Sequence, residues 1–154
     1  MDTKRLNINF AAIPSVGYVG SESAFDEIEQ LVGKKVPSGY VLFIREADGG
    51  HPEVGSFTTL VGPRDNWFDV DLFYSIGTVQ EVNVKDMYAR WQHLLGKHSL
   101  PIGRDGGGNQ IYLDLSDQQK SVWIYLHDEN HAKVKIADCF EEFISSLRIN
   151  PDFV

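Results

Sequence analysis

The order of helical and extended segments is the feature that most constrains the fold of this 154-residue chain. Two segments with helical spacing follow one another directly, and extended segments come after them. A third helical segment then precedes a run of strands and a closing helix. Helices and strands therefore do not alternate as they would in a doubly wound parallel sheet. This order predicts a single α+β domain with a mixed sheet.

The two N-terminal helices have recognisable ends. Apolar side chains recur at helical spacing over residues 23–32, where Ser21 or Ser23 is the expected N-cap and Gly33 the expected C-cap. A second helix follows almost at once and is stopped by the Asp-Gly-Gly sequence of residues 48–50. We therefore expect two helices before the first strand of the main sheet.

A third helix is predicted over residues 84–95, where Asn83 and Asp86 approximate a capping box. Its apolar side chains form a stripe along one face. Strands are expected before and after this helix, in segments rich in β-branched and aromatic residues and bounded by turn signals. The expected strands are residues 56–60, 70–74, 100–103, 110–115, 122–126 and 132–136.

The closing helix has the strongest pattern in the chain. It is predicted over residues 138–148, with Asp138 as the N-cap and Glu141 completing a capping box. We expect it to pack on the sheet with Trp123 or Tyr125 nearby. The side chains expected to face the core are Phe140, Phe143, Ile144 and Leu147.

Charge and cysteine content narrow the classes of function. The chain has 22 acidic and 14 basic side chains and a net charge of −8, so direct binding to nucleic acid is not expected. Cys139 is its only cysteine, which excludes an internal disulfide and is typical of a reducing, cytoplasmic compartment. Residues 6–10 contain two asparagines and lead into no apolar core, so we expect no secretory signal. No run of about 18 apolar residues predicts a membrane span.

Two segments resemble ligand sites without matching their requirements. Residues 104–109 are rich in glycine but lead into a strand, and they lack the spacing of a P-loop or a dinucleotide fingerprint. A tight turn that needs positive φ is the favoured interpretation. His127 and His131 are four residues apart in an expected hairpin loop, whereas a zinc site needs two histidines on one helical face and further ligands. We therefore predict no metal and no cofactor.

The remaining candidates for catalysis have simpler explanations. Cys139 is followed by Glu141 and Glu142, and their charges disfavour the thiolate that a catalytic cysteine needs. Asp69 and Asp71 could act as an acid–base pair, but a solvated strand face explains them equally well. The sequence therefore predicts a protein that is not an enzyme.

The acidic side chains are concentrated between residues 46 and 86. This stretch has eight acidic and two basic residues, together with several aromatic residues, and Trp67 stands in a loop-like context. Acids that steer a basic partner and an aromatic anchor that holds it would suit a protein interface. The alternative is that the aromatic residues are core and the acids are solvated surface. The candidate partner-binding residues are Asp48, Glu53, Asp65, Trp67, Asp69 and Asp71.

Four segments in this order resemble one known family. They are the Pro-Ser-Gly-Tyr helix of residues 36–50, the Pro-Ile-Gly-Arg-Asp-Gly-Gly-Gly strand pair of residues 100–114, the Val-Trp-Ile-Tyr-Leu-His-Asp strand of residues 122–128, and the Phe-Glu-Glu-Phe helix of residues 137–144. Together they resemble the SUKH superfamily of Smi/Knr-like domains. Asp48 stands where this family often has asparagine.

The resemblance implies a fold, a domain boundary and a function. It implies an α+β domain over residues 21–150, with a mixed or antiparallel, curled sheet, after an N-terminal lead-in of residues 1–20. Bacterial members are immunity proteins that bind and neutralise toxins of polymorphic or contact-dependent systems, many of them nucleases. We therefore expect a cytoplasmic, non-catalytic protein, a monomer or weak dimer, that binds a basic toxin domain.

Two alternatives stay open at this stage. Fungal members of the family are linked to cell-wall glucan synthesis, so the chain could be a regulatory scaffold that binds a cellular protein. It could also bind a small molecule, or act as an enzyme, at the glycine-rich turn of residues 104–109.

Overall fold

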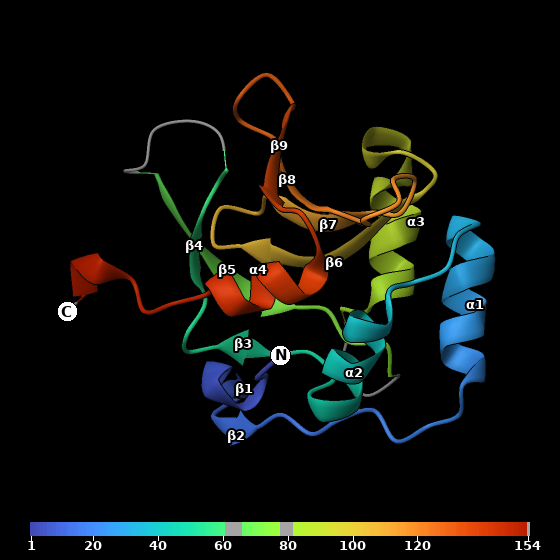
Figure 1. Cartoon of the computed structure of the whole chain (residues 1–154), viewed down its shortest axis with the longest axis horizontal. Helices are drawn as coiled ribbons and strands as arrows, with labels where there is room; N and C mark the ends of the chain where they lie inside the picture. The colour runs from blue at the N-terminus through green and yellow to red at the C-terminus, as the bar shows by residue number, and fades with distance from the viewer. Residues whose placement is uncertain (61–65, 78–81, 154) are drawn as a thin grey trace.

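The computed structural model describes residues 1–60, 66–77 and 82–153, and Figure 1 shows its helices and strands. The α-helices in this part of the chain are α1 (Ser23–Val32), α2 (Ser38–Glu46), α3 (Val84–Leu95) and α4 (Phe140–Ser146). Short 3-10 helices lie at η1 (Lys4–Leu6) and η2 (Pro151–Phe153). The strands are β1 (Ile8–Phe10), β2 (Ile13–Pro14), β3 (His51–Pro52), β4 (Ser56–Thr58), β5 (Trp67–Phe73), β6 (Ser99–Asp105), β7 (Gln110–Asp114), β8 (Val122–Leu126) and β9 (Ala132–Ala137).

The strands form two antiparallel sheets. The larger sheet has six strands in the order β4-β5-β6-β7-β8-β9, so each strand pairs with its neighbour in sequence. The smaller sheet has the order β2-β1-β3. Register shifts interrupt the pairing of β5 with β6, of β6 with β7 and of β8 with β9. Such irregularities bend strands and increase their twist, which gives the larger sheet its curl. The prediction of an α+β domain is confirmed.

Helices α2 and α4 cover one face of the large sheet (Figure 1). Their interface is aromatic: Phe43 of α2 lies 4.9 Å from Phe73 and 5.3 Å from Phe140, measured between ring centroids. Phe143 of α4 contacts Phe57 and Phe73 edge to face, at 5.5 and 6.4 Å. Edge-to-face pairs at these distances add to the stabilisation that burial alone provides.

The four side chains predicted to anchor α4 are buried, which confirms that part of the prediction. The expected neighbours are wrong. Trp123 and Tyr125 pack with Leu95 in a separate cluster, while Ile124 belongs to the main core. Successive side chains of a strand point to opposite faces, so the two aromatic residues lie on the face of β8 that is turned away from α4.

The ends of the helices differ in part from the sequence-based expectations. Gly33 ends α1 in the left-handed conformation, as predicted, and the Asn83 side chain accepts a 2.9 Å hydrogen bond from the Asp86 amide at the start of α3. Glu22, rather than Ser21 or Ser23, occupies the N-cap position of α1. The hydroxyls of these two serines bond each other instead.

Helix α4 is shorter than predicted. Cys139 is its N-cap residue in place of the predicted Asp138, which forms a 2.7 Å ion pair with Lys135 of the preceding strand. Leu147 is already extended, and Arg148 exchanges backbone hydrogen bonds with Ser56 of β4. Pairing with the edge of the sheet thus ends the helix before residue 148.

The first residues of the chain pack against α4. Leu6 and Ile8 belong to the same core as the helices. The Arg5 guanidinium donates to the carbonyl oxygens of Ile144 at 2.5 Å and Leu147 at 2.7 Å. These carbonyls lie at the C-terminal end of α4, where a helix has acceptors without partners and favours positive charge.

Candidate functional site

Three of the six predicted partner-binding residues lie on β5. Trp67 was expected in a loop, but it opens this strand opposite Thr58, because pairing with β4 extends the strand beyond its apolar centre. Trp67 is half-buried and Asp69 is exposed, while Val70 between Asp69 and Asp71 is buried in the core. Asp65 lies outside the described residues.

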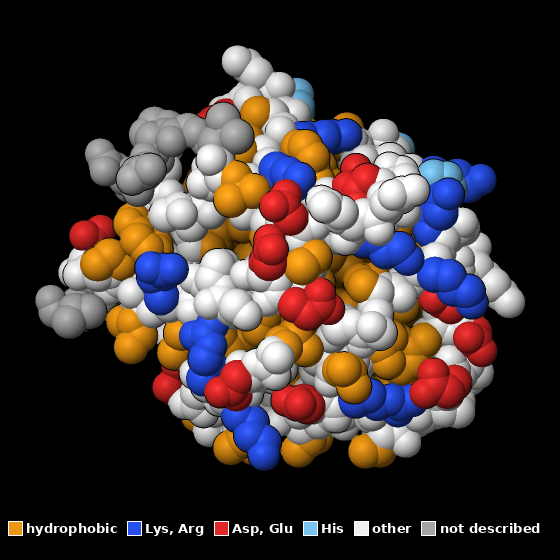
Figure 2. Space-filling model, in the orientation of Figure 1, with side chains coloured by type: hydrophobic (Ala, Val, Ile, Leu, Met, Phe, Trp, Pro, Cys, Tyr) orange, Lys and Arg blue, Asp and Glu red, His pale blue; other side chains and the backbone are white. Residues whose placement is uncertain are grey.

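The carboxylates on β5 already have partners within the chain. Asp69 accepts a hydrogen bond from the Ser56 hydroxyl of the neighbouring strand. Asp71 forms a 3.2 Å ion pair with Arg104 of β6, and both side chains are partly exposed. On the face shown in Figure 2, acidic side chains lie among lysines and arginines and do not form one continuous patch. The acidity of this region is therefore partly balanced locally.

Asp48 and Glu53 lie before and after β3 in the sequence. Glu53 accepts hydrogen bonds from the side chains of Asn7 and Asn9, at 2.5 and 3.3 Å. Asp48 follows α2, and its two oxygens accept from the backbone amides of Ile76 at 2.7 Å and Gly77 at 3.0 Å. The structure thus places Trp67, Asp69 and Asp71 on one strand, with Glu53 and Asp48 on other elements.

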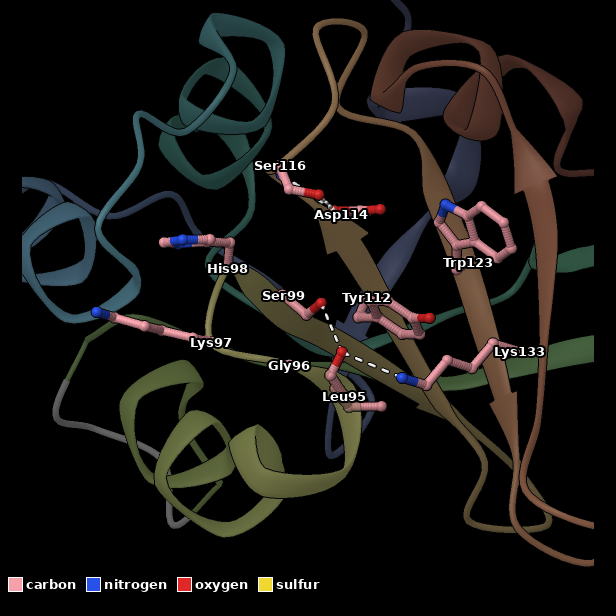
Figure 3. A pocket seen from close by; sticks show the side chains of 10 residues that line it. All are labelled: Leu95, Gly96, Lys97, His98, Ser99, Tyr112, Asp114, Ser116, Trp123 and Lys133. Carbon is pink, nitrogen blue, oxygen red and sulfur yellow. Dashed lines mark hydrogen bonds between the residues drawn. The ribbon is translucent and has the colours of Figure 1, made fainter.

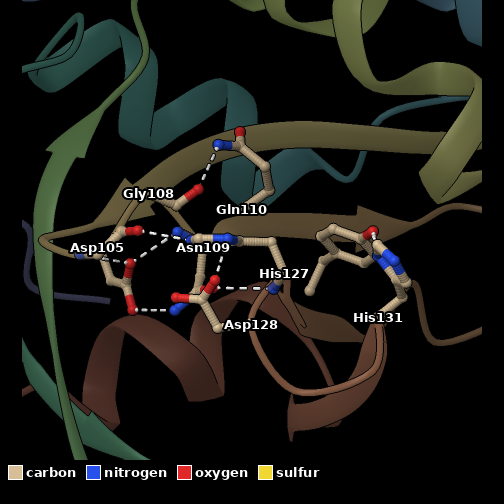
Figure 4. A network of polar contacts seen from close by, with 9 residues as sticks. Asp105, Gly108, Asn109, Gln110, His127, Asp128 and His131 are labelled. Carbon is tan, nitrogen blue, oxygen red and sulfur yellow. Dashed lines mark hydrogen bonds and ion pairs between the residues drawn. The ribbon is translucent and has the colours of Figure 1, made fainter.

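The glycine-rich segment is a turn closed by its own aspartate (Figure 4). The buried Asp105 carboxylate accepts from the amides of Gly107 at 3.0 Å and Asn109 at 2.8 Å, and from the Asn109 side chain at 2.8 Å. Gly108 has φ of +83°, which favours glycine. The prediction of a tight turn is confirmed. Because a protein carboxylate takes up these amides, they are not directed at an external phosphate.

The two histidines have different partners: His127 contacts this turn, and His131 contacts the β8–β9 hairpin. His127 contacts the Gly107 carbonyl through Nε2 at 2.7 Å and Asp128 through Nδ1 at 2.9 Å. His131 instead hydrogen-bonds through Nδ1 to the Tyr125 hydroxyl. Within residues 1–60, 66–77 and 82–153, no group of three or more His, Cys, Asp or Glu side chains is arranged to hold a metal ion.

Cys139 has the environment of a poor nucleophile. The side chain is half-buried at the start of α4. Burial is the main cause that raises the pKa of the Cys139 thiol, and the neighbouring Glu141 raises it further. A catalytic or metal-binding cysteine needs the opposite change, because the thiolate is its reactive form.

A hollow on the back of the sheet was missed by the sequence reasoning (Figure 3). It has a volume of about 300 Å³ and lies between the C-terminal end of α3 and strands β6 to β9. Tyr112 and Trp123 form its aromatic floor, with Lys97, Lys133 and Asp114 around it. The sequence did contain a signal for this hollow. Side chains alternate between the two faces of β7 and β8, and this alternation places aromatic side chains on the face away from the main core.

A second hollow lies beside the β1–β2 hairpin; we call it the N-terminal hollow. It has a volume of about 470 Å³ and is lined by Phe10 and residues 13–20 together with Asp48, Ser75 and Gly77. Hydrophobic side chains are visible along the lower edge of Figure 2, where β2 lies in Figure 1. A signal was present in the sequence as four large apolar residues in the lead-in: Phe10, Ile13, Val16 and Val19.

The fold and these surfaces define an α+β domain whose hollows and exposed strand faces suit binding. The model of the SMI1 / KNR4 family (SUKH-1) matches residues 20–146. The chain therefore belongs to the SMI1/KNR4 (SUKH-1) family, whose members are generally non-catalytic. Among curated proteins, no sequence matches the chain closely enough to count as a relative. No helix in the described part of the chain has both the length and the apolar character needed to cross a membrane.

Proposed function

We propose that this protein is an immunity protein that binds a cognate toxin domain in the cytoplasm and blocks its active site. Membership of the SUKH-1 family supports a role in protein binding. The observation that carries the proposal is the outer part of β5, where a half-buried tryptophan stands two residues from an exposed aspartate on a strand paired with β4. Pairing of Trp67 and Asp69 with β4 presents these side chains without the entropic cost of ordering a loop.

The charge of the chain defines the class of toxin. A net charge of −8 favours a basic partner. Because proteins that bind nucleic acid do so through basic surfaces, a nuclease domain is a natural candidate. Asp69 is the exposed charge that would steer the encounter, while Trp67 would be the anchor that leaves water on binding. Asp71 contributes less, because Arg104 balances it.

The proposal is tested with toxin domains encoded beside the gene for this chain. Co-expression should restore growth of cells that make the toxin, and the purified proteins should form a complex whose association slows with salt. Asp69→Lys should lower the association rate more than Glu129→Lys, a matched reversal at an exposed site in the β8–β9 turn. Trp67→Ala should raise the dissociation rate roughly 30-fold if the tryptophan contributes about 2 kcal/mol.

The outcome also separates the two protein-binding alternatives. If no neighbouring toxin binds and a cell-wall protein does, the chain is a regulatory scaffold and the immunity proposal is wrong. If a toxin binds with unchanged rates for both β5 variants, immunity stands and the β5 surface is not the interface.

A further inference from the structure

The N-terminal hollow continues the inner face of the small sheet beyond the core. Ile8 is 6% exposed and packs in the main core, whereas Phe10, two residues further along β1, is 43% exposed. Phe10 pairs with Ile13 across the hairpin, so both side chains lie on the face that Ile8 buries. The apolar inner face therefore extends past the elements that cover it, with Ile13 at 68% exposure.

The segment that follows the hairpin is fixed in place although its side chains face solvent. The Val16 carbonyl accepts from the Asp48 amide at 2.9 Å, and the Tyr18 amide donates to the Ile44 carbonyl at 2.9 Å. The Arg45 guanidinium donates to the Tyr18 carbonyl at 2.9 Å and lies over the Tyr18 ring. Val16 and Val19 are nonetheless 78% and 97% exposed. A pre-ordered backbone with exposed apolar side chains is typical of an interaction surface.

One charged group lies in this apolar setting. Among the described residues that line the hollow, Asp48 is the only acidic or basic one. None of the ion pairs formed by the described residues involves Asp48, whose oxygens accept only the amides of Ile76 and Gly77. Burial raises the pKa of Asp48, and the hydrogen bonds from the two amides oppose this change only in part. A cation placed here would stabilise that charge.

We propose that the N-terminal hollow receives a lysine or arginine side chain of the toxin, with its charged group at Asp48 and its apolar flanking residues on Phe10, Ile13 and Val19. This inference rests on the proposed function, and it assigns that function a second contact surface. The volume of about 470 Å³ falls within the range of about 300–1,000 Å³ that holds a drug-sized ligand, so a long side chain and its neighbours have room.

The chemistry of long basic side chains fits this arrangement. Their alkyl stems pack on apolar surface while the charged end reaches a polar partner. The Asp48 carboxylate in the lining of the hollow selects the sign of charge, and the exposed valines and Ile13 select apolar neighbours. A second copy of this chain is a poorer occupant, because two molecules of net charge −8 repel each other.

The first test uses two peptides and nuclear magnetic resonance. Acetyl-Leu-Lys-Leu-amide should shift the amide signals of Ile76 and Gly77 in a saturable way, because these amides bind the Asp48 carboxylate. The same peptide with norleucine in place of lysine should bind about ten-fold more weakly, since it lacks the charge. Equal binding of the two peptides, shifts that saturate only elsewhere, or no saturable shift would overturn the proposal.

Variants separate the charge from the apolar wall. Asp48→Asn should abolish the preference for lysine over norleucine, and Val19→Ser should weaken both peptides. Leu42→Ser is the matched control, because Leu42 is also well exposed, at 60%, but lies outside the hollow. If Asp48→Asn does not fold, Val19→Ser still tests the proposal. The Val19 side chain is almost wholly in solvent, so its replacement should not affect folding. Butylamine binding as tightly as the lysine peptide would identify a small amine as the ligand and overturn the protein partner.

The toxin separates this inference from the proposed function. If the toxin binds the Asp48→Asn and Val19→Ser variants as tightly as the natural chain, the inference is wrong and the immunity function stands. If the lysine peptide occupies the hollow and no toxin binds, the immunity function is wrong and the specificity of the hollow stands. Weakening by several-fold in both variants, with Leu42→Ser unchanged, supports both.

Discussion

Phe143 anchors α4 on the large sheet, so its removal should destabilise the domain strongly. It is fully buried in α4, and its ring meets Phe57 of β4 and Phe73 of β5 edge to face. Truncating a buried phenylalanine to alanine costs about 3–5 kcal/mol, from lost transfer free energy and the cavity left behind. The two ring contacts place Phe143→Ala in the upper half of this range, since each such pair adds about 0.5–1.5 kcal/mol.

Urea unfolding monitored by tryptophan fluorescence measures this loss directly. The midpoint should fall while the dependence on urea concentration stays constant, because the surface exposed on unfolding hardly changes. Leu42→Ala, on the exposed side of α2, should change the unfolding free energy by less than about 0.5 kcal/mol. A loss below 1 kcal/mol for Phe143→Ala would refute the assignment of α4 as the helix that closes the core.

Three further changes test other parts of the structure. Ala12→Gly should raise the unfolding free energy by about 1 kcal/mol in the same urea assay, because Ala12 has φ of +67° in the β1–β2 turn, where an alanine is strained; a loss of stability would contradict this turn. Arg5→Ala should lower it by about 1.5–3 kcal/mol, because charged hydrogen bonds to the end of α4 are lost, and Lys4→Ala is the control. Burial raises the pKa of Asp48, so the folded chain keeps this proton to a higher pH than the unfolded chain. The contribution of Asp48 to the unfolding free energy therefore falls as the pH rises from about 3.8 through the folded-state pKa. Across that pH range, the stability of Asp48→Asn relative to the natural chain should rise. The control Glu46→Gln should show a smaller rise.

The elements with strong local patterns could be predicted from the sequence. The bounds of α1 and α3 agree with the predicted ranges, because a stripe of apolar residues and a local end signal coincide in each. The β7–β8 hairpin was also predictable, since both strands are bounded by turn residues. These features depend on interactions between residues close in sequence.

Features set by distant contacts could not be predicted in this way. The end of α4 depends on pairing between Arg148 and Ser56, which are far apart in sequence. The start of β5 at Trp67 likewise depends on β4, which no local pattern at that position shows. The position of Asp48 illustrates the same limit for the candidate site: its charge was apparent, but its placement in an apolar hollow requires β1, β2 and residues 75–77 to come together.

The contact of Arg5 with the end of α4 also has a consequence for synthesis. Its acceptors lie 139 and 142 residues later in the chain. At about 5–20 residues per second, a ribosome needs on the order of ten seconds to make that stretch. The segment around Arg5 therefore waits for residues 144–147 to be made before it can dock, and such distant contacts slow folding. Docking of the segment around Arg5 onto α4 is therefore a late step in the synthesis and folding of this domain.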